Sequence, residues 1–118
     1  MKSSFFSEFP ISQLNEKNFD ENILVQNNDV ICVFFWGHNC PNCDIAKNLL
    51  LDEKERVQSW PIKWFHVNAY EESDLATRYG LHGIPVFMFF QNGKKLGRVT
   101  SFPGVDEFEK VIMKLAST

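Results

Sequence analysis

The chain has 118 residues, enough for one domain with a single core and too few for two. Its 44% hydrophobic content, which includes 12 Phe and 3 Trp, can fill that core without a disulfide scaffold. A formal charge of −3 without a basic cluster argues against nucleic acid as a partner. The longest apolar runs have the length of strands, so no membrane association is expected.

The first ten residues contain one Lys, an early Glu and no apolar stretch typical of a secretory signal. We therefore expect a cytoplasmic protein, with residues 1–10 as an N-terminal extension and residues 11–118 as one domain. Three cysteines are too few, and too odd in number, for a disulfide framework, so a pair and a single cysteine need separate explanations.

The first half of the chain is predicted to contain two strand–helix units. A short strand at 11–14 is followed by a helix that Asn15 caps and that runs to Leu24. Residues 30–36 are almost all β-branched or aromatic, which is typical of a strand covered on both faces. A helix then runs from Cys40 at least to Leu51, and the charged residues after it are predicted to be its exposed continuation.

The second half is predicted to contain three more strands and two helices. A strand at 62–69 precedes a short helix at 74–79, which Ser73 caps and Gly80 ends. The apolar strand 86–90 is joined by Asn92-Gly93, a strong hairpin signal, to a strand at 94–100, and an amphipathic helix at 105–115 closes the chain. The order β-α-β-α-β-α-β-β-α predicts an α/β fold with parallel units first and an antiparallel hairpin last.

Cys40 and Cys43 lie three residues apart, where the apolar strand gives way to the helical pattern. Two thiols across the first turn of a helix can close a small disulfide, and the unpaired N–H groups there stabilise a thiolate. We assign Cys40, which precedes the helix, as the attacking thiol and Cys43, one turn inside, as the resolving thiol. Pro41 suits the first helical position, where its missing N–H costs nothing.

Other candidate residues have more than one interpretation. His38 either stabilises the thiolate when protonated or is an exposed residue without a role. Trp36 belongs either to the core or to the wall of a groove. Cys32 is predicted to be a small buried hydrophobe, and His66 and His82 to be ordinary polar residues rather than ligands.

A zinc site would need two ligands besides the cysteine pair. His38 is one candidate, but the chain has no second Cys-x-x-Cys, and an iron–sulfur cluster shared between two chains is rarer still. No metal and no other cofactor is therefore expected.

A second motif, Gly83-Ile84-Pro85, precedes the strand at 86–90. From the residues alone, its proline is either a plain strand opener or a cis bend.

Together these motifs resemble the thioredoxin family over residues 11–116. They are Phe35-Trp36 before Cys40-x-x-Cys43, Gly83-Ile84-Pro85 about forty residues later, Phe89-Phe90-Gln91-Asn92-Gly93 in the last hairpin, and the closing amphipathic helix. The resemblance implies a thioredoxin fold, a central mixed β-sheet flanked by helices, with Pro85 cis and facing the disulfide.

The resemblance also implies which residues meet a substrate. The Ile84 backbone is expected to pair with the extended chain of a substrate beside its disulfide, in a strand-addition mode. Trp36, Gly83 and Pro85 are expected to bind the substrate with it. His38 and the dipeptide Pro41-Asn42 are expected to modulate the cysteine pair.

The expected function is that of a thiol–disulfide oxidoreductase in cell redox homeostasis, which reduces protein disulfides through a mixed disulfide. Its expected partners are disulfide-containing proteins and, by resemblance, a reductase that donates electrons, and the chain is expected to be a monomer. One alternative is a non-enzymatic binding or scaffold module that keeps the fold without the chemistry. Another, in the same chemical class, is an oxidase or isomerase.

Departures from the family pattern fall near the cysteine pair. Pro41-Asn42 replaces the usual Gly-Pro, so the redox potential cannot be taken over from the family. Phe34 aligns with a buried Asp thought to take the proton of the resolving thiol, and Trp64 with the lysine that partners it.

Two further departures concern the expected substrate groove. Asn39 stands where a Trp usually precedes the first cysteine, and Ser101 where a Gly is usual, although Phe102-Pro103-Gly104 is expected to line the same groove. Together, the departures indicate a thioredoxin-like protein rather than a housekeeping thioredoxin.

Overall fold

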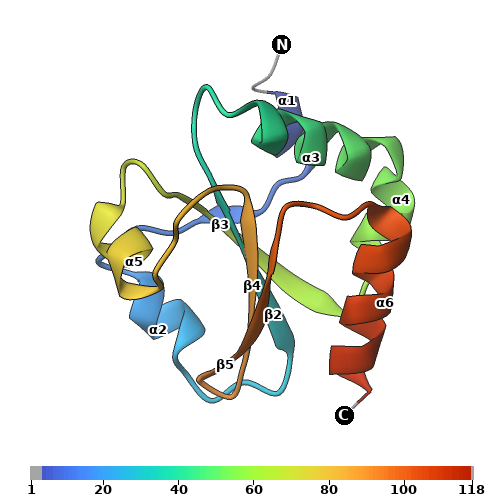
Figure 1. Ribbon diagram of the computed structural model, residues 1–118. Coiled ribbons are helices and arrows are strands. Elements are labelled where there is room, and N and C mark those ends of the chain that lie inside the picture. The colour runs from blue at the N-terminus through green and yellow to red at the C-terminus, as the bar shows by residue number, and fades with distance from the viewer. Residues whose placement is uncertain (1–3, 118) are drawn as a thin grey trace.

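The computed structural model describes residues 4–117, which form one five-stranded sheet with helices on both faces (Figure 1). The strands are β1 (Ser12–Gln13), β2 (Val30–Trp36), β3 (Ile62–Asn68), β4 (Val86–Gln91) and β5 (Lys94–Thr100). Their spatial order is β1-β3-β2-β4-β5, with β2 parallel to β3 and antiparallel to β4. The predicted α/β class and mixed sheet are therefore confirmed.

Six helices cover the two faces of this sheet: α1 (Ser4–Glu8), α2 (Phe19–Ile23), α3 (Pro41–Asp52), α4 (Lys54–Gln58), α5 (Ser73–Arg78) and α6 (Val105–Ala116). All seven residues of β2 are buried, and they alternate between two hydrophobic clusters. One cluster lies under α1, α3, α4 and α6, and the other under α2 and α5. No helix within residues 4–117 is long and apolar enough to cross a membrane.

Several predicted boundaries agree with the structure. The strands predicted at 30–36 and 94–100 have the observed bounds, and the closing helix extends one residue beyond its predicted end. Asn92 and Gly93 have φ values of 52° and 78°, the left-handed pair that a tight hairpin turn requires.

Three local predictions were wrong. Asn15 does not cap α2, because its side-chain oxygen accepts the N–H groups of Lys17 and Asn18 in a turn before the helix. Ser73 lies inside α5, and Glu72 precedes the helix without a side-chain cap. The long helix predicted to continue through the charged residues ends at Asp52, and α4 begins at Lys54.

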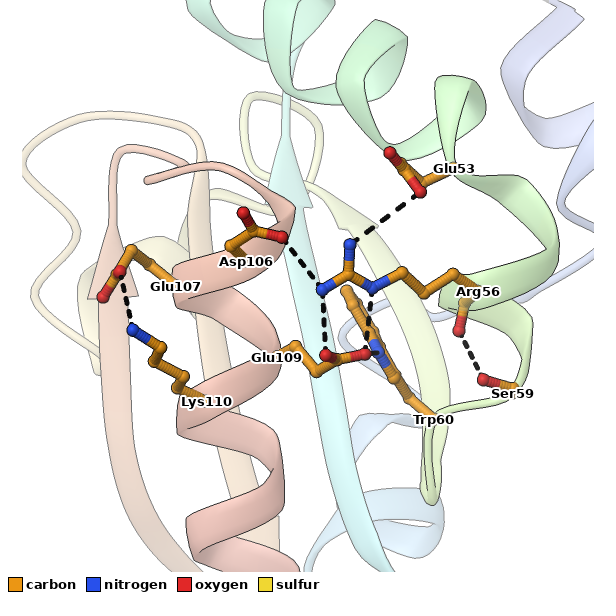
Figure 2. A network of polar contacts seen from close by, with 8 residues as sticks. All are labelled: Glu53, Arg56, Ser59, Trp60, Asp106, Glu107, Glu109 and Lys110. Carbon is orange, nitrogen blue, oxygen red and sulfur yellow. Dashed lines mark hydrogen bonds and ion pairs between the residues drawn. The ribbon is translucent and has the colours of Figure 1, made fainter.

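Arg56 explains why the charged segment is more than a solvated surface. Figure 2 shows its guanidinium reaching from α4 to α6, where Nε and Nη2 donate to the two oxygens of Glu109 at 3.1 and 2.9 Å. Nη2 also lies 2.9 Å from Asp106, and Trp60 Nε1 donates to Glu109 at 2.7 Å. The charged segment therefore forms a separate helix, α4, and Arg56 binds it to the closing helix α6.

Helix α1 places aromatic side chains beneath α3. Phe5 and Phe9 are buried, and the Phe6 ring stacks on His66 at a centroid distance of 3.8 Å. Residues 4–9 of the segment predicted as an extension thus pack against the domain.

His66 lies in the middle of this aromatic layer. Its Nδ1 accepts a hydrogen bond from Trp36 Nε1 at 3.0 Å, and the side chain is buried. Burial, and secondarily the charge of Lys47, lowers the pKa of His66 to about 4, so the imidazole is neutral in the folded protein at neutral pH.

We predict that Glu109→Gln lowers the urea midpoint of unfolding at pH 7, because it removes the charge that Arg56 and Trp60 bind. Hydrogen bonds from Arg56 and then Trp60 hold the pKa of Glu109 at about 2. This contribution to stability is present above about pH 4.5 and is lost as the pH falls toward 2, so variant and wild type should converge there. Glu107→Gln is the control, since its exposed pair with Lys110 lies on the same helix. Equal effects of the two substitutions would contradict this account.

A second prediction concerns the pH dependence of folding. The unfolded chain protonates His66 below about pH 6.5, whereas the folded chain resists protonation down to about 4. Stability should therefore be full above pH 6.5 and fall by about 3 kcal/mol between 6.5 and 4. Urea denaturation across this range should show that His66→Gln, which keeps an acceptor for Trp36, flattens the slope. An unchanged slope in the variant would show that another group causes it.

Candidate active site

The cysteine pair lies where β2 passes into α3. Cys40 is the N-cap of α3 in an extended conformation (φ −118°, ψ 99°), and Pro41 occupies the first turn. The Cys40 sulfur accepts a hydrogen bond from the backbone N–H of Cys43 at 3.1 Å, so it occupies the place of a capping oxygen. Cys40 and Cys43 are joined by a disulfide with their Cα atoms 5.2 Å apart.

The two sulfurs differ in their access to solvent. Cys40 is 8% exposed, whereas Cys43 is fully buried, so a substrate sulfur can approach Cys40 first. The third cysteine, Cys32, is free and fully buried in β2, and burial raises the pKa of its thiol well above the ordinary value. Its prediction as a small buried hydrophobe is confirmed.

The loop before β4 faces the disulfide. The Ile84–Pro85 peptide bond is cis, the geometry that the resemblance implies. The carbonyl oxygen of Ile84 lies 3.7 Å from the Cys40 sulfur. A backbone acceptor that a substrate chain can use therefore lies directly beside the attacking atom.

An open cavity of about 510 Å³ separates this loop from the start of α3. Cys40, Pro41 and Asn42 line one side, and Gly83 and Ile84 line the other. Pro85 itself is buried and is not among the described lining residues.

Trp36 and His38 are not among the described residues that line this cavity. Trp36 is only 7% exposed and packs in the core, outside the described lining of the cavity. The exposed His38 ring lies edge-on to the Trp36 ring at a centroid distance of 5.0 Å. Of the two interpretations of Trp36, the core position is the observed one.

Lys47 is a charged residue of the site that the sequence analysis missed. It is 8% exposed, follows Cys43 by one helical turn, and places its ammonium 4.3 Å from the centroid of the Trp36 ring. Burial lowers the pKa of Lys47, and the nearby Asp44 carboxylate partly offsets this. Its position four residues after Cys43, on the apolar face of the helix, was the available signal.

Phe34 occupies the position of the family's buried carboxylate. Its ring is fully buried and stacks parallel to Phe87 at a centroid distance of 4.7 Å. Phe34 lies opposite His66 on β3, whereas Trp64 lies opposite Cys32. The neighbour of position 34 is therefore His66, and the alignment of the partner lysine with Trp64 was wrong.

The buried polar residues around the pair contain no carboxylate. Within the described part of the chain, the buried polar or charged side chains are those of Lys47, His66 and Asn68. Of these three, the basic side chain on α3 is Lys47, four residues after Cys43.

Other departures have local explanations. Asn39 has a φ of 56°, a left-handed conformation that Asn tolerates better than Trp. Ser101, at a φ of 61°, adopts a conformation for which Gly is the usual residue. Phe102 is partly buried and packs on Phe87 and Phe108, and it is not among the described residues that line the cavity beside the disulfide.

Among the residues that the structure describes, no group of three or more His, Cys, Asp or Glu side chains could hold a metal ion.

Comparison with known proteins gives a consistent family. The Thioredoxin family model matches residues 10–116. A chloroplastic M-type thioredoxin of Pisum sativum is 28% identical over 86% of this chain and 60% of its own length. Thioredoxin of Griffithsia pacifica is 33% identical over 75% of this chain and 80% of its own.

A solved structure gives the same result for the fold. The crystal structure of Malassezia sympodialis thioredoxin (Mala s 13) has a TM-score of 0.72 over 90% of both chains, at 19% identity. These findings agree with the family-model match and with a cysteine pair that is joined by a disulfide. The chain belongs to the thioredoxin family of thiol–disulfide oxidoreductases, with Cys40 and Cys43 as its Cys-x-x-Cys pair.

Proposed function

We propose that the protein reduces disulfides of other proteins, with Cys40 as the attacking thiol and Cys43 as the resolving thiol. One observation carries this proposal: the more accessible sulfur caps α3 and faces the Ile84 carbonyl, while the other sulfur is buried one turn further on. The attacking atom and the backbone that would align a substrate are therefore adjacent.

The reaction transfers two electrons in two exchange steps. The Cys40 thiolate attacks one sulfur of the substrate disulfide, whose S–S bond breaks to give a mixed disulfide and a departing substrate thiolate. Cys43, once deprotonated, attacks the Cys40 sulfur, closes the Cys40–Cys43 disulfide and releases the second substrate thiolate. Both substrate sulfurs end as thiols, and a dithiol reductant must restore the pair.

The charges around the pair favour the first step over the second. The helix N-terminus and the buried Lys47 ammonium support the Cys40 thiolate. The second step lacks the family's carboxylate, because Phe34 fills that position. The proton of Cys43 then has to pass to the departing substrate thiolate or to solvent, which makes resolution the slower step.

The proposed setting follows from this chemistry. A reductant needs a compartment that keeps thiols reduced, and the cytoplasm is the one we propose. Its proposed partners are disulfide-containing proteins and an electron-donating reductase, and the proposed working form is a monomer.

The direct test is reduction of insulin with dithiothreitol as electron source. Cys40→Ser should abolish reduction, because the attacking sulfur is lost. Without dithiothreitol, reduced Cys43→Ser should instead form mixed disulfides with insulin, which a non-reducing gel shows and which added dithiothreitol removes. Full insulin reduction by Cys40→Ser would contradict the proposal. A pull-down partner set unchanged by the double variant Cys40→Ser/Cys43→Ser would favour a binding module.

A further prediction concerns Lys47. Lys47→Met keeps the packing on Trp36 but removes the buried charge, so less of the reduced protein should carry a thiolate at neutral pH. The rate of alkylation by iodoacetamide at pH 6.5 should fall about threefold. Lys54→Met is the control, since that exposed lysine pairs with Glu8 away from the cysteines. An equal rate in Lys47→Met and wild type would show that the buried ammonium has no influence.

A further inference from the structure

Tyr70 is an exposed aromatic residue on a firmly held backbone. Its side chain is 65% exposed, more than any other large hydrophobic or aromatic residue in the described part of the chain. The segment that carries it is fixed by Asn68, which is buried and whose side-chain oxygen accepts the N–H groups of Tyr70 and Glu71 at 3.0 and 3.2 Å. Ala69 N also donates to Trp36 O at 2.7 Å, which ties the segment to the end of β2.

The Tyr70 ring lies against the loop that leads to Cys40. A Cβ atom on Gly37 would lie 2.6 Å from two carbons of the ring and 2.8 Å from Cδ1 of Ile84. The ring and the Ile84 side chain therefore both lie close to the backbone of Gly37, in space that a Cβ atom would occupy. Glycine at this position allows that approach, which no other residue would allow without a shift.

The same ring forms a wall of the cavity beside the disulfide. Tyr70 lines this cavity together with the apolar side chains of Pro41, Ala69, Leu81 and Ile84. None of the described lining residues is an Asp, Glu, Lys or Arg. Asn39, Asn42 and His82 also line the cavity, so an apolar side chain can be buried against the Tyr70 side, whereas a charged one would lose water there without gaining an oppositely charged Asp, Glu, Lys or Arg.

The residue directly before Cys40, Asn39, does not supply an aromatic surface beside the attacking sulfur. At this position, directly before the first cysteine, the family usually carries a Trp, and the left-handed backbone here holds an Asn instead. The aromatic surface next to the attacking sulfur is thus supplied by a different element, the segment after β3.

We propose that Tyr70 determines substrate choice, by binding an aromatic or large aliphatic side chain next to the half-cystine that Cys40 attacks. This inference rests on the proposed reductase function. A substrate whose sulfur joins Cys40 is expected to have its backbone beside Ile84, whose carbonyl oxygen lies 3.7 Å from that sulfur. The Ile84 side chain and the Tyr70 ring both approach the backbone of Gly37 and both line the cavity. The residue adjacent to the attacked cysteine therefore reaches the ring, and the substrate class is protein disulfides with apolar flanking residues.

The test uses two synthetic peptides with the same internal disulfide, flanked by Phe in one and by Glu in the other. Wild type should reduce the Phe-flanked peptide with a kcat/KM about tenfold higher. Tyr70→Ala should lose most of this preference by slowing on the Phe-flanked peptide, and Tyr70→Phe should retain it. Met113→Ala, which removes an exposed apolar side chain on α6, is the matched control and should behave as wild type.

Hydroxyethyl disulfide, which has no peptide chain, measures the cysteine pair alone. Met113→Ala should reduce it at the wild-type rate, and a far-UV circular dichroism spectrum that matches wild type shows that Tyr70→Ala is folded. A preference that survives in Tyr70→Ala, or that is absent in wild type, would overturn the role of Tyr70 while leaving the reductase function intact. Failure of wild type to reduce any of the three disulfides would overturn both.

Discussion

The chemistry of this protein depends on one junction, at which the Cys40 sulfur serves as the N-cap of α3. The hydrogen bond from Cys43 N at 3.1 Å ties the two cysteines together through the first turn of the helix. The buried strand β2 holds the near side of the junction. Strand β4, antiparallel to β2, brings Ile84 and Pro85 to the other side. The sheet therefore sets both the position of the nucleophile and the backbone against which a substrate aligns.

Around that junction, packed aromatic side chains occupy the position of the carboxylate that accepts a proton in the family. The stacked rings of Phe34 and Phe87 fill the space where the family places a carboxylate, and an aromatic pair of this kind contributes about 0.5–1.5 kcal/mol beyond its burial. The remaining buried charge is the ammonium of Lys47, and His66 is neutral. The N-terminus of α3 supports an anionic Cys40 sulfur, whereas the buried residues that the structure describes offer the resolving thiol no carboxylate. We therefore expect attack by Cys40 on the substrate disulfide to be faster than resolution of the mixed disulfide by Cys43.

The sequence predicted the parts of this arrangement that depend on local pattern. Apolar runs located β2 and β4, Asn92-Gly93 located the hairpin, and the spacing of Cys40 and Cys43 located the site. It could not reveal contacts between distant segments. The segment of Arg56 was predicted to be solvated, whereas Arg56 binds α6, and neither Lys47 nor Tyr70 was singled out. Tertiary packing gives each residue its surroundings, and only Lys47, on the apolar face of its helix, carries a local signal of it.

The equilibrium between the Cys40–Cys43 pair and glutathione at pH 7 measures most directly whether the junction produces a reductant. A protein that reduces other proteins should have a potential more negative than about −240 mV, within the range of the cytosolic glutathione pool or below it. In equilibrium with that pool alone such a pair would be largely oxidised, so the electron-donating reductase proposed above has to keep it reduced. A potential near or above about −180 mV, where protein disulfide isomerase lies, would contradict a reducing role and indicate an oxidase or isomerase instead.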